Sequence, residues 1–230
     1  MTAPVRWESC YRIIAAHLPR IDIFEQVCEP GDLAAILRLE AMTNPRMLEV
    51  SAAIRSVEPE DCVTGPGSTF VMAPFAYPRP SRFTDGTFGI YYAGDVVDTA
   101  IAEHKHHSEI FLADTSEPPG VFDHRVIEAA VDCPLEDVAR NDRAGELLNP
   151  NDYRASRAFG AVLHGKRADG LVWPSVRRPG GTCIGIFKPR LVHNARSAYY
   201  LGYRWDGTFV SDVFRMESLT QTYPVDPPTR

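Results

Sequence analysis

The chain has 230 residues, of which 44% are hydrophobic and 23% charged, a composition typical of one large globular domain or of one domain with an extension. The net charge is −6 and there is no long basic run, so binding to nucleic acid is disfavoured. No apolar stretch reaches about 18 residues. The N-terminal segment lacks the apolar core of a signal peptide, so we expect a cytoplasmic protein that does not cross a membrane.

The first 65 residues favour short helical pieces. Residues 11–16 fit a strand or a short helix, and residues 22–29 fit a short helix. Two further helices are expected to begin at Asp32 and Pro45, because apolar residues follow each of them at helical spacing. We therefore expect residues 1–65 to form a helical extension that packs on the core or on a second subunit. The alternative is a lid over an active site.

The predicted core, residues 66–230, begins after a glycine-rich loop, and its first two predicted strands flank an arginine. Residues 69–75 and 88–93 are apolar and aromatic runs that predict strands. Between them, prolines hold the chain extended just before Arg82. A glycine ends the second run, and Asp95 is the expected N-cap of a helix with apolar residues at helical spacing.

This order brings a cation, an aromatic face and a carboxylate into one neighbourhood. Arg82 precedes the second strand, and Tyr91 and Tyr92 point to opposite faces of that strand. Glu103 lies about two turns into the following helix. The residue types alone favour a structural explanation, in which Arg82 and Glu103 form an ion pair between strand and helix and the tyrosines belong to the core.

Histidines follow Glu103 on the same predicted helix. Thr99, Glu103, His106 and His107 share one face at i, i+3 and i+4 spacing, and such a group can converge on a metal ion. The pattern lacks the HExxH motif, and none of the five cysteines lies in a CxxC pair, so we expect neither a metal site nor structural disulfides. The favoured interpretation is that one histidine forms a hydrogen bond near Glu103 and the others are solvated.

The second half of the chain contains alternating strand and helix signals. The predicted elements are a strand at 121–131, a one-sided helix at 155–163 that Asn151 or Asp152 caps, strands at 170–173 and 183–187, a hairpin at 199–214 and a loose tail from Tyr223. Ser175 lies in the turn after the strand at 170–173, and Arg177 follows it. A serine in a turn carries no functional signal by itself.

The ordered set of these residues resembles the RES family, which is named for its arginine, glutamate and serine. The resemblance covers about residues 68–192. It is carried by Arg82-Phe83, Tyr92-Ala-Gly-Asp95, Ala100-Ile-Ala-Glu103 and the downstream Gly170-Leu-Val-Trp-Pro-Ser175-Val-Arg177, with Gly180-Gly-Thr-Cys-Ile184 after it. It implies an α+β fold similar to that of ADP-ribosyltransferases, with two small β-sheets around a cleft for NAD.

The resemblance also implies an activity and partners. Several family members are toxins of type II toxin–antitoxin pairs that degrade NAD by phosphorolysis or hydrolysis, so NAD is the expected substrate and inorganic phosphate the co-substrate of phosphorolysis. An Xre-type antitoxin and a homodimer are expected by the same resemblance. The alternatives are ADP-ribosyl transfer to a protein and a non-catalytic NAD-binding module.

Site residues follow from the match of this sequence to the family pattern. The expected catalytic residues are Arg82, Tyr92, Glu103 and Ser175, with Tyr91 as the alternative to Tyr92. The expected contacts to NAD are made by Arg82, Tyr92, Ser175 and Arg177, and no metal or further cofactor is expected.

Overall fold

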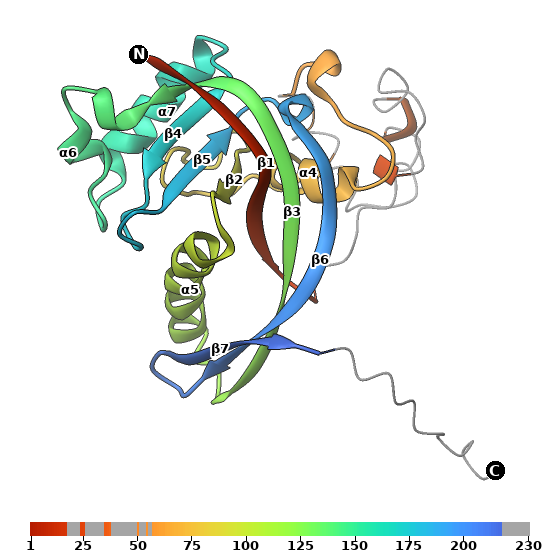
Figure 1. The fold of residues 1–230 in the computed structure, drawn as a ribbon, viewed down its shortest axis with the longest axis vertical. Coiled ribbons are helices and arrows are strands. Elements are labelled where there is room, and N and C mark those ends of the chain that lie inside the picture. Colours follow the sequence, from red (N-terminus) through yellow and green to blue (C-terminus); the bar gives the residue numbers. More distant parts are fainter. Residues whose placement is uncertain (18–23, 26–34, 38–49, 51–53, 55–56, 218–230) are drawn as a thin grey trace.

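The computed structural model describes residues 1–17, 24–25, 35–37, 50, 54 and 57–217 (Figure 1). These residues form a mixed α and β fold built on one seven-stranded sheet, in the order β1-β2-β5-β4-β3-β6-β7. The strands are β1 (Thr2–Ala15), β2 (Tyr91–Gly94), β3 (Gly120–Asp137), β4 (Gly170–Pro174), β5 (Thr182–Ile186), β6 (Val192–Trp205) and β7 (Val210–Met216). The helices are α4 (Ser68–Ala76), α5 (Val97–Asp114), α6 (Ala144–Leu147) and α7 (Arg154–Gly165), with short 3₁₀ turns η2 (Pro59–Asp61), η3 (Val138–Arg140) and η4 (Pro189–Leu191).

The long strand β3 pairs with three other strands, β1, β4 and β6, and so holds the sheet together. One of its edges pairs antiparallel with β1, from Thr2↔Glu136 to Ala15↔His124. Its other edge pairs first with β6 and then, at Glu136↔Leu171, in parallel with β4. Since β1 also pairs with β2, the strands β1, β2, β5, β4 and β3 close into a ring from which β6 and β7 extend (Figure 1).

The expected division into two small sheets is therefore not what the described residues form. The reason is the length of β3, whose 18 residues are enough to pair with β6 and then with β4, so that one continuous sheet results. Its pattern of β-branched and apolar residues alternating with polar ones is typical of such a strand.

The beginning of the chain also differs from the expected helical extension. Residues 2–15 form β1, which is part of the sheet: their backbone pairs with β3, and over residues 2–8 exposed side chains alternate with more buried ones. Most of the helices predicted between residues 22 and 54 lie outside the described residues. Four described side chains of that stretch belong to the hydrophobic core that includes α4: Phe24, Leu37, Val50 and Ile54.

The segment 69–75, predicted as a strand, forms the helix α4 instead. Most of its side chains are buried, and in a short, mainly apolar run the periodicity is the same for a buried strand and a buried helix. Gly67, at φ 82°, precedes the helix, and Pro74 is accommodated near its end.

The other predicted elements of the core are confirmed with shifted boundaries, and the largest shifts are at the end of β3, which is Asp137 instead of residue 131, and at the start of β6, which is Val192 instead of residue 199. The strand expected at 88–93 is β2, and the hairpin, the one-sided helix and the strands of the second half correspond to β6–β7, α7, β3, β4 and β5. The N-cap of α5 is Val96 and not Asp95. The Asp95 carboxylate still lies at this end of the helix, because it accepts hydrogen bonds from the Val96 N–H (2.8 Å) and the Thr99 hydroxyl (2.6 Å). The tail from Tyr223 lies outside the described residues.

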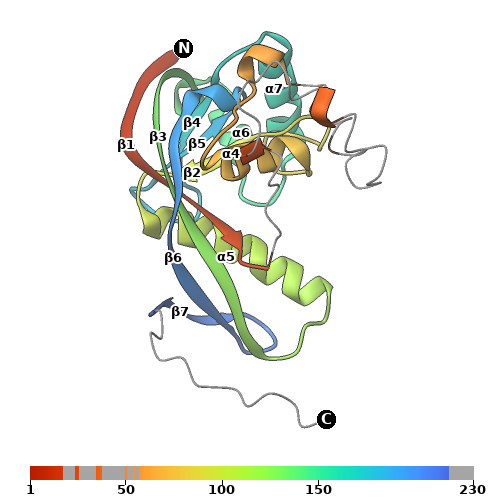
Figure 2. The ribbon, with the colours of Figure 1, turned by 90° about the vertical axis from the view of Figure 1, so that its right-hand side faces the viewer.

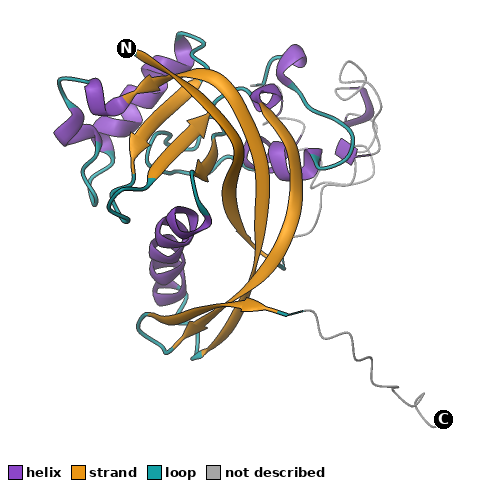
Figure 3. Cartoon of the chain, in the orientation of Figure 1, coloured by secondary structure: helices purple, strands orange, loops and turns teal. Residues whose placement is uncertain are grey.

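Three hydrophobic clusters cover the sheet. The first joins α4 to β1 and β3, the second joins α6 and α7 to β4 and β5, and the third joins α5 to the lower parts of β1, β3, β6 and β7. Figures 1 and 2 show α5 on the concave side of the long curved strands, and Figure 3 shows helices on both sides of the strands. No described helix is long and apolar enough to span a membrane.

Candidate active site

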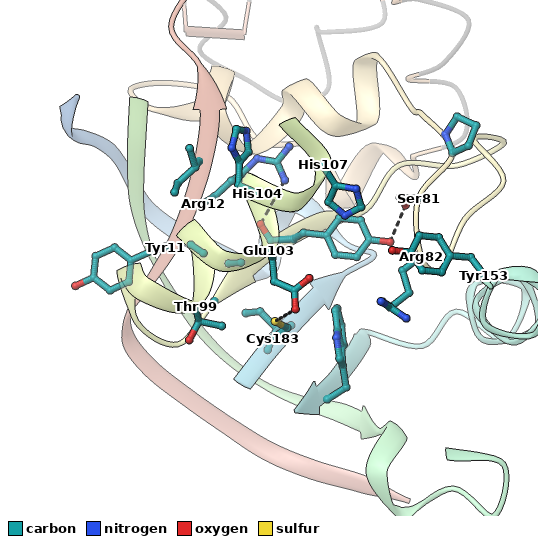
Figure 4. Close-up of a pocket in the computed structure, with 18 of the residues that line it drawn as sticks. Tyr11, Arg12, Ser81, Arg82, Thr99, Glu103, His104, His107, Tyr153 and Cys183 are labelled. Carbon is teal, nitrogen blue, oxygen red and sulfur yellow. Dashed lines mark hydrogen bonds between the residues drawn. The ribbon is translucent and has the colours of Figure 1, made fainter. Parts of the chain in front are cut away.

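A cavity of about 500 Å³ lies between α5, β1, β2, β5 and the loop that precedes β2 (Figure 4). Its volume falls in the range of about 300–1,000 Å³ that is usual for small-molecule sites. The residues that line it are Tyr11, Arg12, Ile13, Pro80, Ser81, Arg82, Tyr92, Ala93, Gly94, Thr99, Ala100, Glu103, His104, His107, Tyr153, Arg157, Trp173, Cys183 and Ile184. Three of the predicted residues, Arg82, Tyr92 and Glu103, are among them.

Ser175, which is not among the lining residues, contacts Glu103 of the cavity directly. The Ser175 hydroxyl donates a hydrogen bond of 2.6 Å to Glu103 Oε1. The Ser175 hydroxyl oxygen in turn accepts hydrogen bonds from the backbone N–H groups of Arg177 (3.2 Å) and Arg178 (3.0 Å), so the turn after β4 orients the Ser175 hydroxyl toward Glu103. The helix α5 and the turn after β4 therefore bring together a glutamate and a serine that are far apart in the sequence.

Arg82 is buried at the edge of the cavity, with 5% of its surface exposed. Its Nη1 donates to the Asn149 carbonyl (2.7 Å), and its guanidinium carbon lies 4.4 Å from the centre of the Tyr153 ring. Burial lowers the pKa of Arg82. Among the described residues its Nη2 has no hydrogen-bond partner, and no ion pair joins Arg82 to Glu103. The structural ion pair is thus the wrong explanation, and a buried donor remains for a ligand.

The two neighbouring tyrosines of β2 face different surroundings. The Tyr92 hydroxyl accepts the N–H of Phe83 (3.2 Å) and shares a hydrogen bond with Ser81 (2.8 Å), while its ring meets the edge of Trp173 with the ring centres 6.0 Å apart. Burial raises the pKa of Tyr92 to about 12. Tyr91 is fully buried in the first core cluster. The cavity is therefore lined by Tyr92, while Tyr91 packs in the core.

Arg177 lies outside the cavity lining. Its Nη2 donates to the Pro150 carbonyl (2.5 Å) and lies 2.8 Å from His106 Nε2. His106 therefore forms its hydrogen bond with an arginine beside the Glu103 site, whereas His107 lines the cavity itself. Within the described ranges, no group of three or more histidine, cysteine or carboxylate side chains is placed to hold a metal ion.

Several lining residues were not predicted from the sequence. Arg12 comes from β1, and Tyr153 and Arg157 lie one helical turn apart at the start of α7, where both arginines, Arg82 and Arg157, approach the Tyr153 ring. Trp173 is the last apolar residue of β4. In the sequence, Arg12 stands out only as a charged residue inside an apolar run. Tyr153 and Arg157 are four residues apart, a spacing that places two side chains on the same face of a helix.

Comparison with known proteins identifies the family. The RES domain model matches residues 61–206, which is more than half of the chain, and the chain belongs to this family. No match is found among curated proteins. Among solved structures, a chain in the crystal structure of the M. tuberculosis MbcT–MbcA toxin–antitoxin complex is similar over 86% of both chains, with 12% sequence identity and a TM-score of 0.43.

Proposed function

We propose that this protein degrades NAD by cleaving the bond between nicotinamide and ribose. The observation that carries the proposal is the Glu103 carboxylate, which Ser175 holds at 2.6 Å in a cavity that also contains the unpartnered Nη2 of Arg82. The membership of the RES family supports the same conclusion.

The chemistry explains why a carboxylate is required. As the bond to nicotinamide breaks, positive charge develops on the ribose, as it does in glycoside hydrolysis. Nicotinamide leaves from a cationic ring, so no general acid has to protonate it. An anionic Glu103 stabilises the developing charge, and the Ser175 hydrogen bond keeps its carboxylate in one orientation.

The other residues bind the substrate. Arg82 offers a free N–H to phosphate oxygens, since a guanidinium recognises phosphate through planar pairs of hydrogen bonds. Tyr92 and Trp173 provide aromatic surface for the nicotinamide ring. Arg177, although outside the lining, adds positive charge near Arg82 and in this way supports an anion site.

The acceptor defines the reaction. With inorganic phosphate the products are ADP-ribose 1″-phosphate and nicotinamide, and with water they are ADP-ribose and nicotinamide. Family membership further suggests the role of a toxin in a type II pair, acting in the cytoplasm as a homodimer and inhibited by an Xre-type antitoxin. Transfer of ADP-ribose to a protein would use the same cavity.

The test is the concentration of NAD over time with the purified chain, with and without inorganic phosphate. We expect loss of NAD with the native chain and at least about a 100-fold lower rate with Glu103→Gln, which keeps the shape but removes the charge. Asp114→Asn, an exposed carboxylate at the end of the same helix, is the matched control and should retain the rate.

Each result of this assay assigns an acceptor or rejects the proposal. Loss that depends on phosphate identifies phosphorolysis, and equal loss without phosphate identifies hydrolysis. If NAD is stable under both conditions, labelled NAD added to a cell lysate tests protein ADP-ribosylation. Full activity of Glu103→Gln would reject the site.

A further inference from the structure

β1 brings a further arginine, in addition to Arg82 and Arg157, into the cavity from a part of the chain outside the matched family region. Arg12 lies on β1 (Thr2–Ala15), whereas the RES model begins at residue 61. In the close-up view, Arg12 and Arg82 lie on different sides of the Glu103 carboxylate (Figure 4).

The guanidinium of Arg12 is poorly satisfied by the protein. It donates one hydrogen bond from Nη1 to the Tyr92 carbonyl at 3.3 Å, and its carbon lies 5.2 Å from the centre of the Tyr91 ring. Its Nε is buried without a partner, and none of the ion pairs among the described residues includes Arg12. A guanidinium has five N–H donors, so most of the capacity of this group is unused.

Burying a cation lowers the stability of the fold unless a carboxylate or another anion neutralises its charge. Glu103 is the one carboxylate among the residues that line the cavity, and it forms no ion pair with Arg12; the ionisable side chains nearest to Arg12 are Tyr91, Tyr92 and His104. Burial, and to a lesser extent the nearby histidines His124 and His107 and the Arg12 charge, lower the pKa of His104, so that the histidine beside Arg12 is neutral near pH 7. An anionic ligand in the cavity would supply the missing partner.

We propose that Arg12 forms a second anion subsite, which binds a phosphate oxyanion on the side of Glu103 away from Arg82. The inference rests on the proposed function and deepens it, because NAD phosphorolysis needs to bind two anions: the pyrophosphate of the dinucleotide and the attacking phosphate. The oxyanion at Arg12 has one of these two sources.

Arg12→Gln is the variant that tests the subsite, and Arg125→Gln is its matched control. Arg125 lies on β3, has a buried Nε without a partner and contacts aromatic rings in the same manner, but it does not line the cavity. Arg12→Lys keeps the charge and should recover part of the loss. Thermal unfolding of all three variants measures any effect on the fold.

Binding of ADP-ribose and of inorganic phosphate to the full chain is measured by calorimetry, and this readout does not require turnover. Loss of one guanidinium–phosphate contact is expected to weaken binding by about 10- to 100-fold. If Arg12→Gln weakens ADP-ribose and leaves phosphate unchanged, the subsite holds the pyrophosphate. If it weakens phosphate and leaves ADP-ribose unchanged, the subsite holds the acceptor.

Kinetics separate the same two sources. Nicotinamide riboside contains the scissile bond but no phosphate, so a pyrophosphate subsite predicts a higher KM for NAD in Arg12→Gln and no change for the riboside. An acceptor subsite predicts a higher KM for inorganic phosphate with both substrates.

Unchanged binding of both anions in Arg12→Gln would overturn the subsite. It would also be overturned if Arg12→Gln and Arg125→Gln lost anion binding to the same extent and in proportion to their loss of thermal stability. If the native chain binds ADP-ribose but does not degrade NAD, the proposed function fails and the binding assay still tests Arg12.

Discussion

Adjacent tyrosines of β2 show how a single position in a strand determines the role of a side chain. Successive side chains of a strand point to opposite faces, so Tyr92 faces the cavity while Tyr91 enters the core. The Tyr92 hydroxyl joins β2 to the loop of Ser81 and Phe83, which also carries Arg82. The Tyr91 hydroxyl is buried and has no partner in the described part of the chain.

Removal of the Tyr92 hydroxyl should therefore lower activity, whereas removal of the Tyr91 hydroxyl should leave activity unchanged. Tyr92→Phe loses the two hydrogen bonds that hold the Arg82 loop, and we expect kcat/KM for NAD to fall by about 10-fold. Tyr91→Phe removes an unsatisfied polar atom from the core, and we expect unchanged turnover with a free energy of unfolding that is equal or higher by about 1 kcal/mol. Steady-state kinetics and thermal unfolding of both variants measure these effects. A greater loss of activity in Tyr91→Phe would show that the wrong tyrosine has been assigned to the site.

At the scale of elements, the helix α7 supports the loop that carries Arg82. Arg157 of α7 donates to the Ser81 carbonyl (2.9 Å), and Gly160 packs so closely that a Cβ there would lie 1.9 Å from the Phe83 carbonyl oxygen. Gly165, on the same helix, has open space around its Cα. The position of the Arg82 loop therefore depends on a helix that is more than 70 residues away in the sequence.

Gly160→Ala should displace this loop. The added methyl group cannot fit without movement of backbone, so we expect a loss of about 1–3 kcal/mol in stability, despite the higher helix propensity of alanine, and a lower rate of NAD cleavage. Gly165→Ala is the control and should keep the rate and the stability. Thermal unfolding and the NAD assay test both variants, and equal behaviour of the two would contradict the close packing.

At the scale of the whole molecule, β1 closes the ring of strands and α5 fills its concave side. Where these parts meet, the rings of His104, His124 and Tyr203 contact one another, with the His104 and His124 ring centres 4.8 Å apart. Burial is the main cause that lowers the pKa of both histidines, and for His104 the value lies well below 6.5. The folded protein therefore holds both rings in the neutral form near neutral pH.

This cluster predicts a loss of stability in mild acid. Below pH 6.5, the ordinary value for histidine, the unfolded chain takes up protons that the folded chain excludes, so the stability present above this pH is lost as the pH falls toward the folded-state values. The loss is at most about 1.4 kcal/mol per pH unit for each histidine. We expect the melting temperature to fall between pH 7 and pH 5, and to fall less steeply in His104→Gln than in the exposed-site control His193→Gln. Parallel slopes in all three proteins would exclude the cluster as the cause.

The sequence alone was sufficient for what depends on local order and residue type. The strands of the second half and the helix α5 follow from periodicity and turn residues. The ordered motif indicated the family, which the RES match over residues 61–206 shows, and it is the basis on which Arg82, Tyr92, Glu103 and Ser175 are predicted as site residues. Three of these four line one cavity, and the fourth donates a hydrogen bond to Glu103.

Only the tertiary structure decided what depends on contacts between distant segments. The apolar run that became α4 is buried on most sides, so its pattern did not separate a helix from a strand. The pairing of β3 with β1, β6 and β4 made one sheet from strands that local signals would allow in two. The same pairing placed Arg12 in the cavity, because the position of a side chain across a sheet is set by long-range backbone hydrogen bonds that no local sequence pattern specifies.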